Sequence, residues 1–226
     1  MYDNTILKYH IKLKNTLFNK AMMSLENPKQ STNVLEFNIP LDILNSIGLP
    51  NYIEEHCENN VAYTLKQYVN DIYYFNKNTK VIKEIDFKEC FMSKPNIIIC
   101  MFTFNSPEFH KSDLDSIMEY IKNNESVLLG SFYDVDRIRQ LKEEPKEIYD
   151  IKDDKLIFAY NVVRGMKISN KVHLFETEYL INKAKEHDLT IEFFKYSDVD
   201  TKQERFLSDD FLKSLSLRTC FICKAN

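Results

Sequence analysis

Residues 95–105 read PNIIICMFTFN, and this stretch decides the fold class. Its residues 97–102 form an unbroken apolar run, which is typical of a strand buried on both faces of a parallel sheet. The stretch SVLLGSF, residues 126–132, has the same character. Helix-like segments follow each of them, at 112–122 and at 134–141. The sequence therefore predicts an α/β fold with a parallel sheet that is covered by helices on both faces.

Outward from this centre, the pattern predicts further elements on both sides. Upstream we expect a helix over 6–25, a strand over 33–37, an extended piece near 52–53, a long helix over about 59–75 and a strand over 80–85. Downstream we expect a hairpin or meander from 155–160 and 171–174, a helix over 175–186, and strands over 189–196 and 217–223. The last two strands are joined by a long connection and should pair antiparallel at one edge.

The composition limits the functional classes. The chain has 226 residues, 44% of them hydrophobic, and a net charge of −4. No apolar run reaches the roughly 20 residues that a membrane span needs, and the first ten residues lack a signal-peptide layout. Five irregularly spaced cysteines suit free thiols in a reducing compartment. We therefore expect a soluble, cytoplasmic protein with no membrane partner and no overall basic footprint for nucleic acid.

The order of these segments resembles the Rossmann-like fold of S-adenosylmethionine-dependent methyltransferases, and the details are similar to mRNA cap guanine-N7 methyltransferases. The similarity rests on residues 9–22 as the opening helix, 33–37 as the first strand and 95–105 as the fourth. Residues 126–141 and 171–199 resemble later segments of that family. The resemblance implies seven strands in the order 3-2-1-4-5-7-6, mostly parallel with an antiparallel last strand. It also implies one domain over 1–226 with an insertion at about 142–174.

The chain departs from the family at the cofactor loop. In the family an acidic residue at the end of the first strand is followed by Gly-x-Gly, and this loop wraps the amino-acid end of the cofactor. Here Glu36 keeps the carboxylate, but Phe37, Asn38, Ile39 and Pro40 follow it. A proline removes a donor and fixes φ, and a branched side chain crowds the place where the backbone should meet a ligand. We therefore expect no bound cofactor, with Glu36 and Asn38 as vestigial candidates.

The rest of the implied site is altered as well. The family's ribose-binding acid, at the end of the second strand, falls near Glu54 or Glu55, and Glu55 is the third vestigial candidate. After the fourth strand the family has a Gln and a His-Tyr pair; this chain has instead Met101, Asn105 and Ser106. The acid that contacts the cap base falls near Asn170. The resemblance thus implies that both halves of the site are eroded.

No other constellation in the sequence indicates chemistry. The five histidines are isolated from any nucleophile–base pattern, so no catalytic residue is assigned. Cys220 and Cys223 form a CxxC, but they lie in an apolar strand, where positions i and i+3 face opposite ways. We therefore interpret both as structural and expect no metal site.

Three functions remain open. An eroded methyltransferase resembles the small subunit of poxvirus-type mRNA capping enzymes, which implies a viral, non-catalytic regulatory subunit. It would form a heterodimer with a larger catalytic capping-enzyme or cap-methyltransferase subunit and meet capped RNA only indirectly. The first alternative is an active, divergent RNA cap methyltransferase that uses S-adenosylmethionine, because methyl transfer relies mainly on alignment. The second is an unrelated α/β protein-interaction module.

Overall fold

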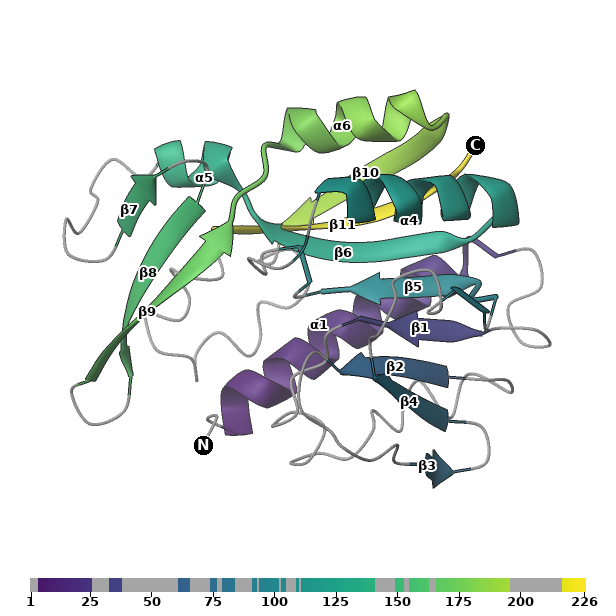
Figure 1. The fold of residues 1–226 in the computed structure, drawn as a ribbon, viewed down its shortest axis with the longest axis horizontal. Coiled ribbons are helices and arrows are strands. Elements are labelled where there is room, and N and C mark those ends of the chain that lie inside the picture. The colour runs from purple at the N-terminus through teal and green to yellow at the C-terminus, as the bar shows by residue number, and fades with distance from the viewer. Residues whose placement is uncertain are drawn as a thin grey trace.

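A computed structural model gives the arrangement of the chain (Figure 1). It describes residues 4–25, 33–37, 61–65, 74–76, 79–83, 91–92, 94–101, 103–104, 109, 111–140, 149–152, 155–162, 166–195 and 217–226. The strands of the main sheet are β1 Val34–Glu36, β2 Val61–Leu65, β3 Tyr74–Asn76, β4 Thr79–Lys83, β5 Ile97–Cys100, β6 Val127–Tyr133, β10 Leu189–Lys195 and β11 Arg218–Ala225.

The main sheet is mixed, with eight described strands in the order β10-β11-β6-β5-β1-β2-β4-β3. Strands β4, β2, β1, β5 and β6 are parallel neighbours. Strand β11 pairs antiparallel with both β6 and β10, as the sequence predicts for the last two strands. The expectation of seven strands is wrong in number, because β3 adds an antiparallel edge strand beside β4. When β3 is left out and the other seven strands are renumbered along the chain, so that β4 becomes strand 3 and β11 strand 7, the order is the expected 3-2-1-4-5-7-6.

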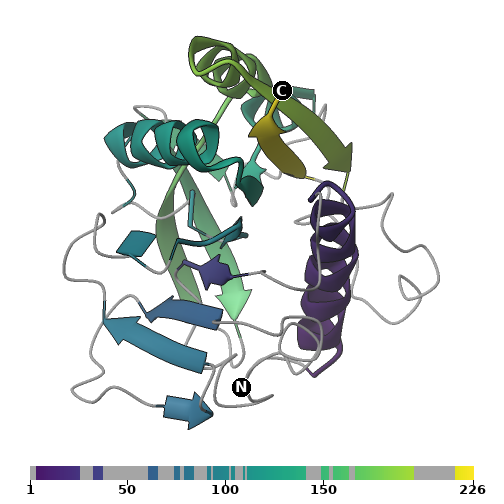
Figure 2. The same ribbon diagram turned by 90° about the vertical axis from the view of Figure 1, so that its right-hand side faces the viewer.

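Helices cover the two faces of this sheet. The described helices are α1 Asn4–Met22, α4 Lys111–Asn124, α5 Val135–Gln140 and α6 Thr177–Glu186. Helices α4 and α6 lie on one side of the sheet and α1 lies on the other (Figure 2). Successive residues of a strand face opposite ways, so β1 turns Leu35 toward α4 and Glu36 toward α1. The fold thereby gives each face of the sheet its own apolar layer.

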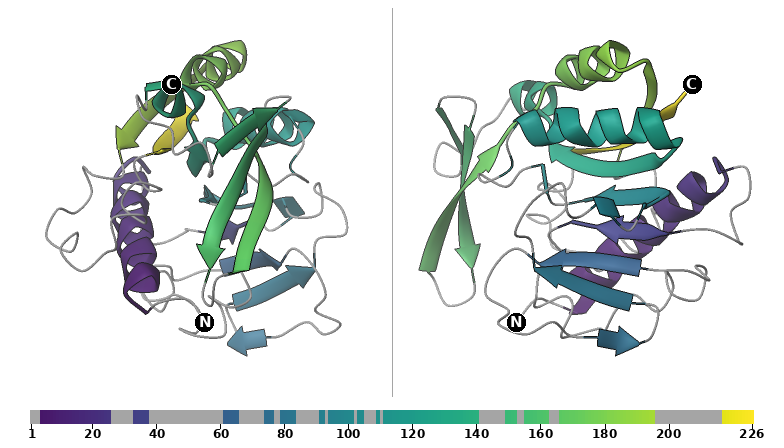
Figure 3. Two further views of the ribbon diagram at one scale, coloured as in Figure 1. Left: turned by 90° about the vertical axis from the view of Figure 1, so that its left-hand side faces the viewer. Right: turned by 45° about the vertical axis from the view of Figure 1, so that its right-hand side comes forward.

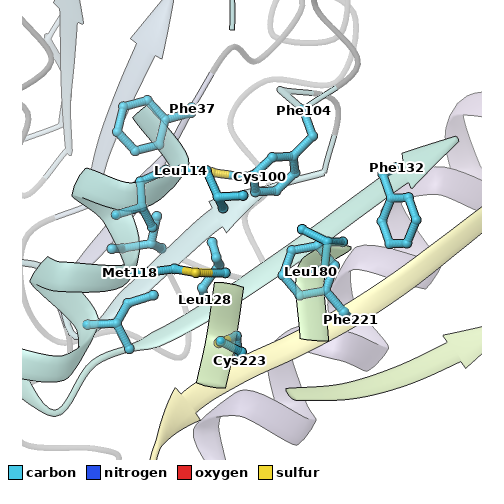
Figure 4. Close-up of a cluster of buried hydrophobic side chains, with 14 of the residues drawn as sticks. Phe37, Cys100, Phe104, Leu114, Met118, Leu128, Phe132, Leu180, Phe221 and Cys223 are labelled. Carbon is cyan, nitrogen blue, oxygen red and sulfur yellow. The ribbon is translucent and has the colours of Figure 1, made fainter. Parts of the chain in front are cut away.

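A large apolar cluster lies between the sheet and helices α4 and α6. Phe104, Phe132 and Phe221 pack there with their ring centroids 5.5 to 6.0 Å apart around Phe221. Leu114 and other apolar residues of α4 complete the cluster (Figure 4). Burial of aromatic and aliphatic side chains of this size contributes roughly 1.5–3 kcal/mol each. These residues supply the main apolar layer of the described part of the chain.

A second, smaller sheet follows α5. Strands β7 Tyr149–Lys152, β8 Lys155–Val162 and β9 Met166–His173 form an antiparallel meander. It lies within the stretch expected as an insertion. Figure 3 shows it beyond the carboxyl ends of the parallel strands, with β9 leading back to α6. The meander therefore stands beside the edge at which ligands bind in open α/β sheets.

One helix expected from the sequence is wrong. Residues 59–75 were expected to be helical, but the chain forms β2 at 61–65 and begins β3 at Tyr74. Pairing explains the difference, because β2 lies between β1 and β4 in the sheet, and tertiary context overrides local periodicity. The extended piece near 52–53 lies outside the described residues. None of the described helices is both long and apolar enough to cross a membrane.

Candidate functional site

Glu36 is the last residue of β1 and stands at the carboxyl edge of the parallel strands. The register pairs it with Tyr63 on β2 and with Ile99 on β5. Ligands of doubly wound sheets bind at this edge, next to the point where the strand order reverses. In this chain the order reverses between β1 and β5. Glu36 therefore occupies the position from which a carboxylate reaches a ligand in this fold.

A lysine from the opening helix meets this carboxylate. The Nζ atom of Lys14 lies 3.0 Å from each of the two carboxylate oxygens of Glu36. Lys14 is 7% exposed and Glu36 is 3% exposed. Leu17 and Phe18, three and four residues further along α1, are buried as well. Helix α1 thus places a positive charge on Glu36, the first of the candidate residues named from the sequence.

The energetics make this pair a strong structural constraint. A charge taken out of water is unfavourable unless it is paired and hydrogen-bonded. Removing one partner of a buried ion pair costs about 3–5 kcal/mol, because the other charge is left uncompensated. Lys14 and Glu36 satisfy each other in this way. The carboxylate is therefore engaged by the chain itself.

Phe37, the residue after the end of β1, is still hydrogen-bonded to β5. The backbone N–H of Phe37 donates to the carbonyl of Ile99, 2.9 Å away. Its own carbonyl accepts a hydrogen bond from the Thr103 hydroxyl at 3.1 Å. The Phe37 side chain is buried in the apolar cluster (Figure 4). Its ring lies edge-on to that of Phe91, with ring centroids 6.2 Å apart. Phe37 is therefore fixed by backbone and side chain at the place where the family has its first loop residue.

The remaining candidates are not brought together by the described structure. Asn38, Glu54, Glu55, Asn105 and Ser106 lie outside the described residues.

Two further candidates have described positions. Met101 is buried and directly follows β5, two residues after Ile99, the partner of Glu36. Asn170 pairs with Phe158 in the meander and so belongs to the other sheet.

Sequence reasoning missed Lys14. A signal for it exists, because Lys14, Phe18 and Ala21 are spaced i, i+4 and i+7 along one face of the helix. Phe18 and Ala21 are fully buried. A lysine on an apolar helix face requires a buried partner, but only the tertiary structure identifies that partner as Glu36.

A second polar cluster lies at the carboxyl end of β6. Asp134 is buried, and its Oδ2 atom accepts hydrogen bonds from the hydroxyls of Thr219 at 2.8 Å and Thr177 at 3.2 Å. Its Oδ1 atom accepts from the backbone N–H of Asp136 at 3.0 Å. Arg137 Nε donates to the Thr219 hydroxyl at 2.8 Å. This cluster joins β6, β11, α5 and α6, and its groups satisfy one another.

The cysteines of the CxxC are inside the core. Cys220 and Cys223 are buried in β11, where the register pairs them with Ser131 and Leu128 of β6. Burial raises the pKa of the Cys223 thiol to about 12, so this thiol carries no charge at neutral pH. Within the described ranges, no group of three His, Cys, Asp or Glu side chains is placed to hold a metal ion.

Solved structures with the same fold are methyltransferases. An S-adenosylmethionine-dependent methyltransferase from Clostridium acetobutylicum is 11% identical, with 96% of this chain and 92% of that chain covered and a TM-score of 0.51. The glycopeptide N-methyltransferase MtfA, in complex with S-adenosylmethionine, is 9% identical, with 95% and 94% covered and a TM-score of 0.55. The CcbJ methyltransferase from Streptomyces caelestis is 10% identical, with 95% of both chains covered and a TM-score of 0.52.

These similarities establish the fold. The chain has the Rossmann-like fold of S-adenosylmethionine-dependent methyltransferases over nearly its whole length. No protein-family model matches the sequence, and no curated protein matches it by sequence. The similarity to known proteins is therefore one of architecture.

At the carboxyl edge, the carboxylate that would meet a bound S-adenosylmethionine is held by the chain itself. The amino-acid end of S-adenosylmethionine carries an ammonium group, which needs an anion when it is taken out of water. Glu36 already has both oxygens on the Lys14 ammonium. Phe37, the next residue, is tied to β5 by its N–H and buried by its ring. The ammonium of Lys14 therefore occupies the place beside Glu36 that the ligand's ammonium would take.

Proposed function

We propose that this chain is a non-catalytic methyltransferase-fold subunit that binds and activates a cap guanine-N7 methyltransferase. The buried Lys14–Glu36 ion pair carries the proposal. It supplies internally the positive charge that Glu36 would otherwise take from a ligand. The segment pattern over 9–22, 95–105 and 126–141, which resembles cap methyltransferases, supports the choice of partner.

The ion pair opposes cofactor binding through a simple competition. A ligand ammonium that reached Glu36 would displace Lys14 and leave the lysine charge buried without its partner. That displacement costs about 3–5 kcal/mol, which corresponds to a loss of roughly two to four orders of magnitude in affinity. A domain of this kind needs no cofactor to act on a partner. By binding one conformation of the catalytic subunit more tightly, it shifts that subunit toward its competent state.

The same ion pair also favours a second function, that of an active methyltransferase. The amino-acid end of S-adenosylmethionine is a zwitterion, and a lysine beside a glutamate is complementary to a carboxylate and an ammonium. If the two side chains separated to receive the ligand, the chain would be an active RNA cap methyltransferase that relies on alignment. The position of Glu36 at the ligand edge of the sheet favours this reading.

Isothermal titration calorimetry with S-adenosylmethionine separates the two functions. The measurement compares the wild-type chain with Lys14→Met and Glu36→Gln. For a non-catalytic subunit we expect no heat of binding in the wild type at millimolar ligand. Micromolar binding by the wild type that both substitutions abolish would establish the enzyme instead and remove the first proposal.

The activating role has its own assay. The chain is co-expressed with a candidate cap guanine-N7 methyltransferase from the same source, and the complex is purified. Methylation of unmethylated capped RNA is then measured with and without this chain. We expect a higher rate with the chain present, and the same rate with Glu36→Gln if that variant still forms the complex. An unchanged rate on adding the wild-type chain would contradict the proposal.

A further inference from the structure

The pairing register of the meander β7-β8-β9 separates its residues into two chemically different faces. Directly opposed residues in an antiparallel pair share a face, and successive residues alternate between faces. One face takes Leu156, Phe158, Tyr160 and Val162 from β8, and none of their partners on β7 or β9 is charged. The other face takes Lys152, Lys155, Lys167, Lys171 and His173, with Asp150 as the one acidic residue and Ile157, Ala159, Asn161 and Ser169 as the uncharged residues between them. We call this second set the basic face.

The basic residues are concentrated in one cross-strand row. Lys152 is paired with Lys155, and Lys155 is paired with His173 on its other side. Like charges placed directly opposite each other destabilise a sheet by roughly 0.2–1 kcal/mol per pair. A lysine beside a lysine in such a row therefore weakens the meander unless an anion binds across both. The same arrangement makes the row a binding place for a negatively charged partner.

This row lies at the end of the meander nearest the main sheet. His173 precedes Leu174 and Phe175, and the backbone N–H of Phe175 donates to the carbonyl of Tyr133 at the end of β6. From there the basic face extends outward along β9 to Lys167, six residues or about 20 Å away. The meander itself stands beyond the carboxyl ends of the parallel strands (Figure 3). A ligand on this face would run from the ligand edge of the fold along the insertion.

We propose that the basic face of the meander binds the sugar–phosphate backbone of a single-stranded nucleic acid. Regularly spaced phosphates match a strip of lysines, and each neutralised phosphate releases counterions, which favours binding. The strip is local, because the chain as a whole has a net charge of −4. This inference does not depend on whether the chain is a regulatory subunit or an enzyme.

An anionic membrane is the competing partner, and the register argues against it. A segment that lies on a membrane inserts its apolar residues while basic residues flank them on the same surface. Here the lysines share their face with Ile157 and Ala159, whereas the larger apolar set, with Leu156, Phe158 and Val162, takes the opposite face of the same sheet. A nucleic acid needs only the basic face and leaves the apolar face for packing.

Fluorescence anisotropy with a labelled oligouridine of about 20 nucleotides tests this. Binding is measured from roughly 50 to 200 mM NaCl for the wild-type chain and two triple variants. The first variant removes three charges of the basic face, Lys152→Gln, Lys155→Gln and Lys171→Gln. The matched control removes three charges from exposed sites elsewhere, Lys94→Gln, Lys185→Gln and Lys224→Gln. Both variants change the net charge equally.

We expect the basic-face variant to lose about tenfold or more in affinity, with the slope of log K against log salt reduced by about 2, and the control to stay near wild type. Thermal unfolding verifies that both variants remain folded. A DNA oligomer of the same length that binds comparably supports recognition of the backbone. Equal losses in both variants, no binding by the wild type, or binding only to phosphatidylserine vesicles would overturn the proposal.

Discussion

At the scale of single residues, Lys14 determines the surroundings of the carboxylate at the carboxyl end of β1. A carboxylate at the end of β1 is a ligand group when it is free and a structural group when it is paired. Here it is paired by an internal ammonium 3.0 Å away, out of solvent. In this structure the Glu36 side chain is thus part of an internal ion pair.

Replacing Lys14 by Met should destabilise the chain by about 3–5 kcal/mol, because Glu36 would stay buried without its counter-charge. The double variant Lys14→Met with Glu36→Met should recover much of that loss, because both charges are gone. Urea unfolding of the four species completes a double-mutant cycle. Simple additivity of the two single effects would show that the pair is not coupled.

Gly130 has a packing role in the middle of β6. A Cβ atom added there would overlap the ring of Phe221 and approach Cε2 of Phe104 to 2.7 Å. We expect Gly130→Ala to cost about 1–3 kcal/mol by overpacking. Substituting the larger neighbour as well, in Gly130→Ala with Phe221→Leu, should restore part of the loss in thermal unfolding. A neutral Gly130→Ala would contradict the close packing.

At the scale of elements, the Asp134 cluster ties four segments together. Thr219 on β11 donates to Asp134 and accepts from Arg137, and Thr177 links the start of α6 to the same carboxylate. Asp134 also bridges to Phe175, the residue that leads from the meander into α6. The cluster thus fixes how the meander returns to the sheet.

Thr219→Val removes this hydroxyl while it keeps the shape of the side chain. We expect a loss of about 2–3 kcal/mol, because a buried carboxylate and a guanidinium each lose a partner. Thr190→Val is the matched control, since its hydroxyl donates to the Lys224 carbonyl at an exposed site, and it should cost under about 0.5 kcal/mol. Equal effects in chemical denaturation would show that the cluster is not structural.

At the scale of the whole molecule, the buried thiols report on global unfolding. Cys100, Cys220 and Cys223 lie in the central strands β5 and β11 and are fully buried. In a Cys57→Ser, Cys90→Ser background we expect no alkylation of these three by iodoacetamide at pH 8 until the chain unfolds. Mass spectrometry along a denaturant series measures this. Rapid modification of the native chain would contradict the packing of the sheet.

The raised pKa of Cys223 also predicts how stability depends on pH. Burial moves this thiol from an ordinary pKa of 9.0 to about 12, so above pH 9 the unfolded chain releases its proton while the folded chain keeps it. The free energy of unfolding should therefore fall as pH rises above this value, by up to about 1.4 kcal/mol per unit. Comparing wild type with Cys223→Ala isolates the effect. Parallel pH profiles would show that Cys223 does not contribute.

Local pattern was sufficient for most of the described elements. The buried strands β5 and β6, the helices after them and the antiparallel β10 and β11 were predictable, because apolar runs and helical spacing are properties of the chain itself. Residues 61–65 were not, because their identity as β2 depends on the strands on either side. The site was half predictable. Glu36 was identified through the resemblance, which places an acid at the end of the first strand, whereas its partner Lys14 is 22 residues away in the sequence.

The sequence by itself determined the α/β class, the order of most elements and the presence of a carboxylate at the end of the first strand. The tertiary structure decided what that carboxylate meets, because only the packing of α1 against the sheet brings Lys14 to Glu36. It also decided which lysines of the meander share a face, because that depends on strand register. Periodicity is local and can be read along the chain, whereas the pairing of charges is set by which elements fold against each other.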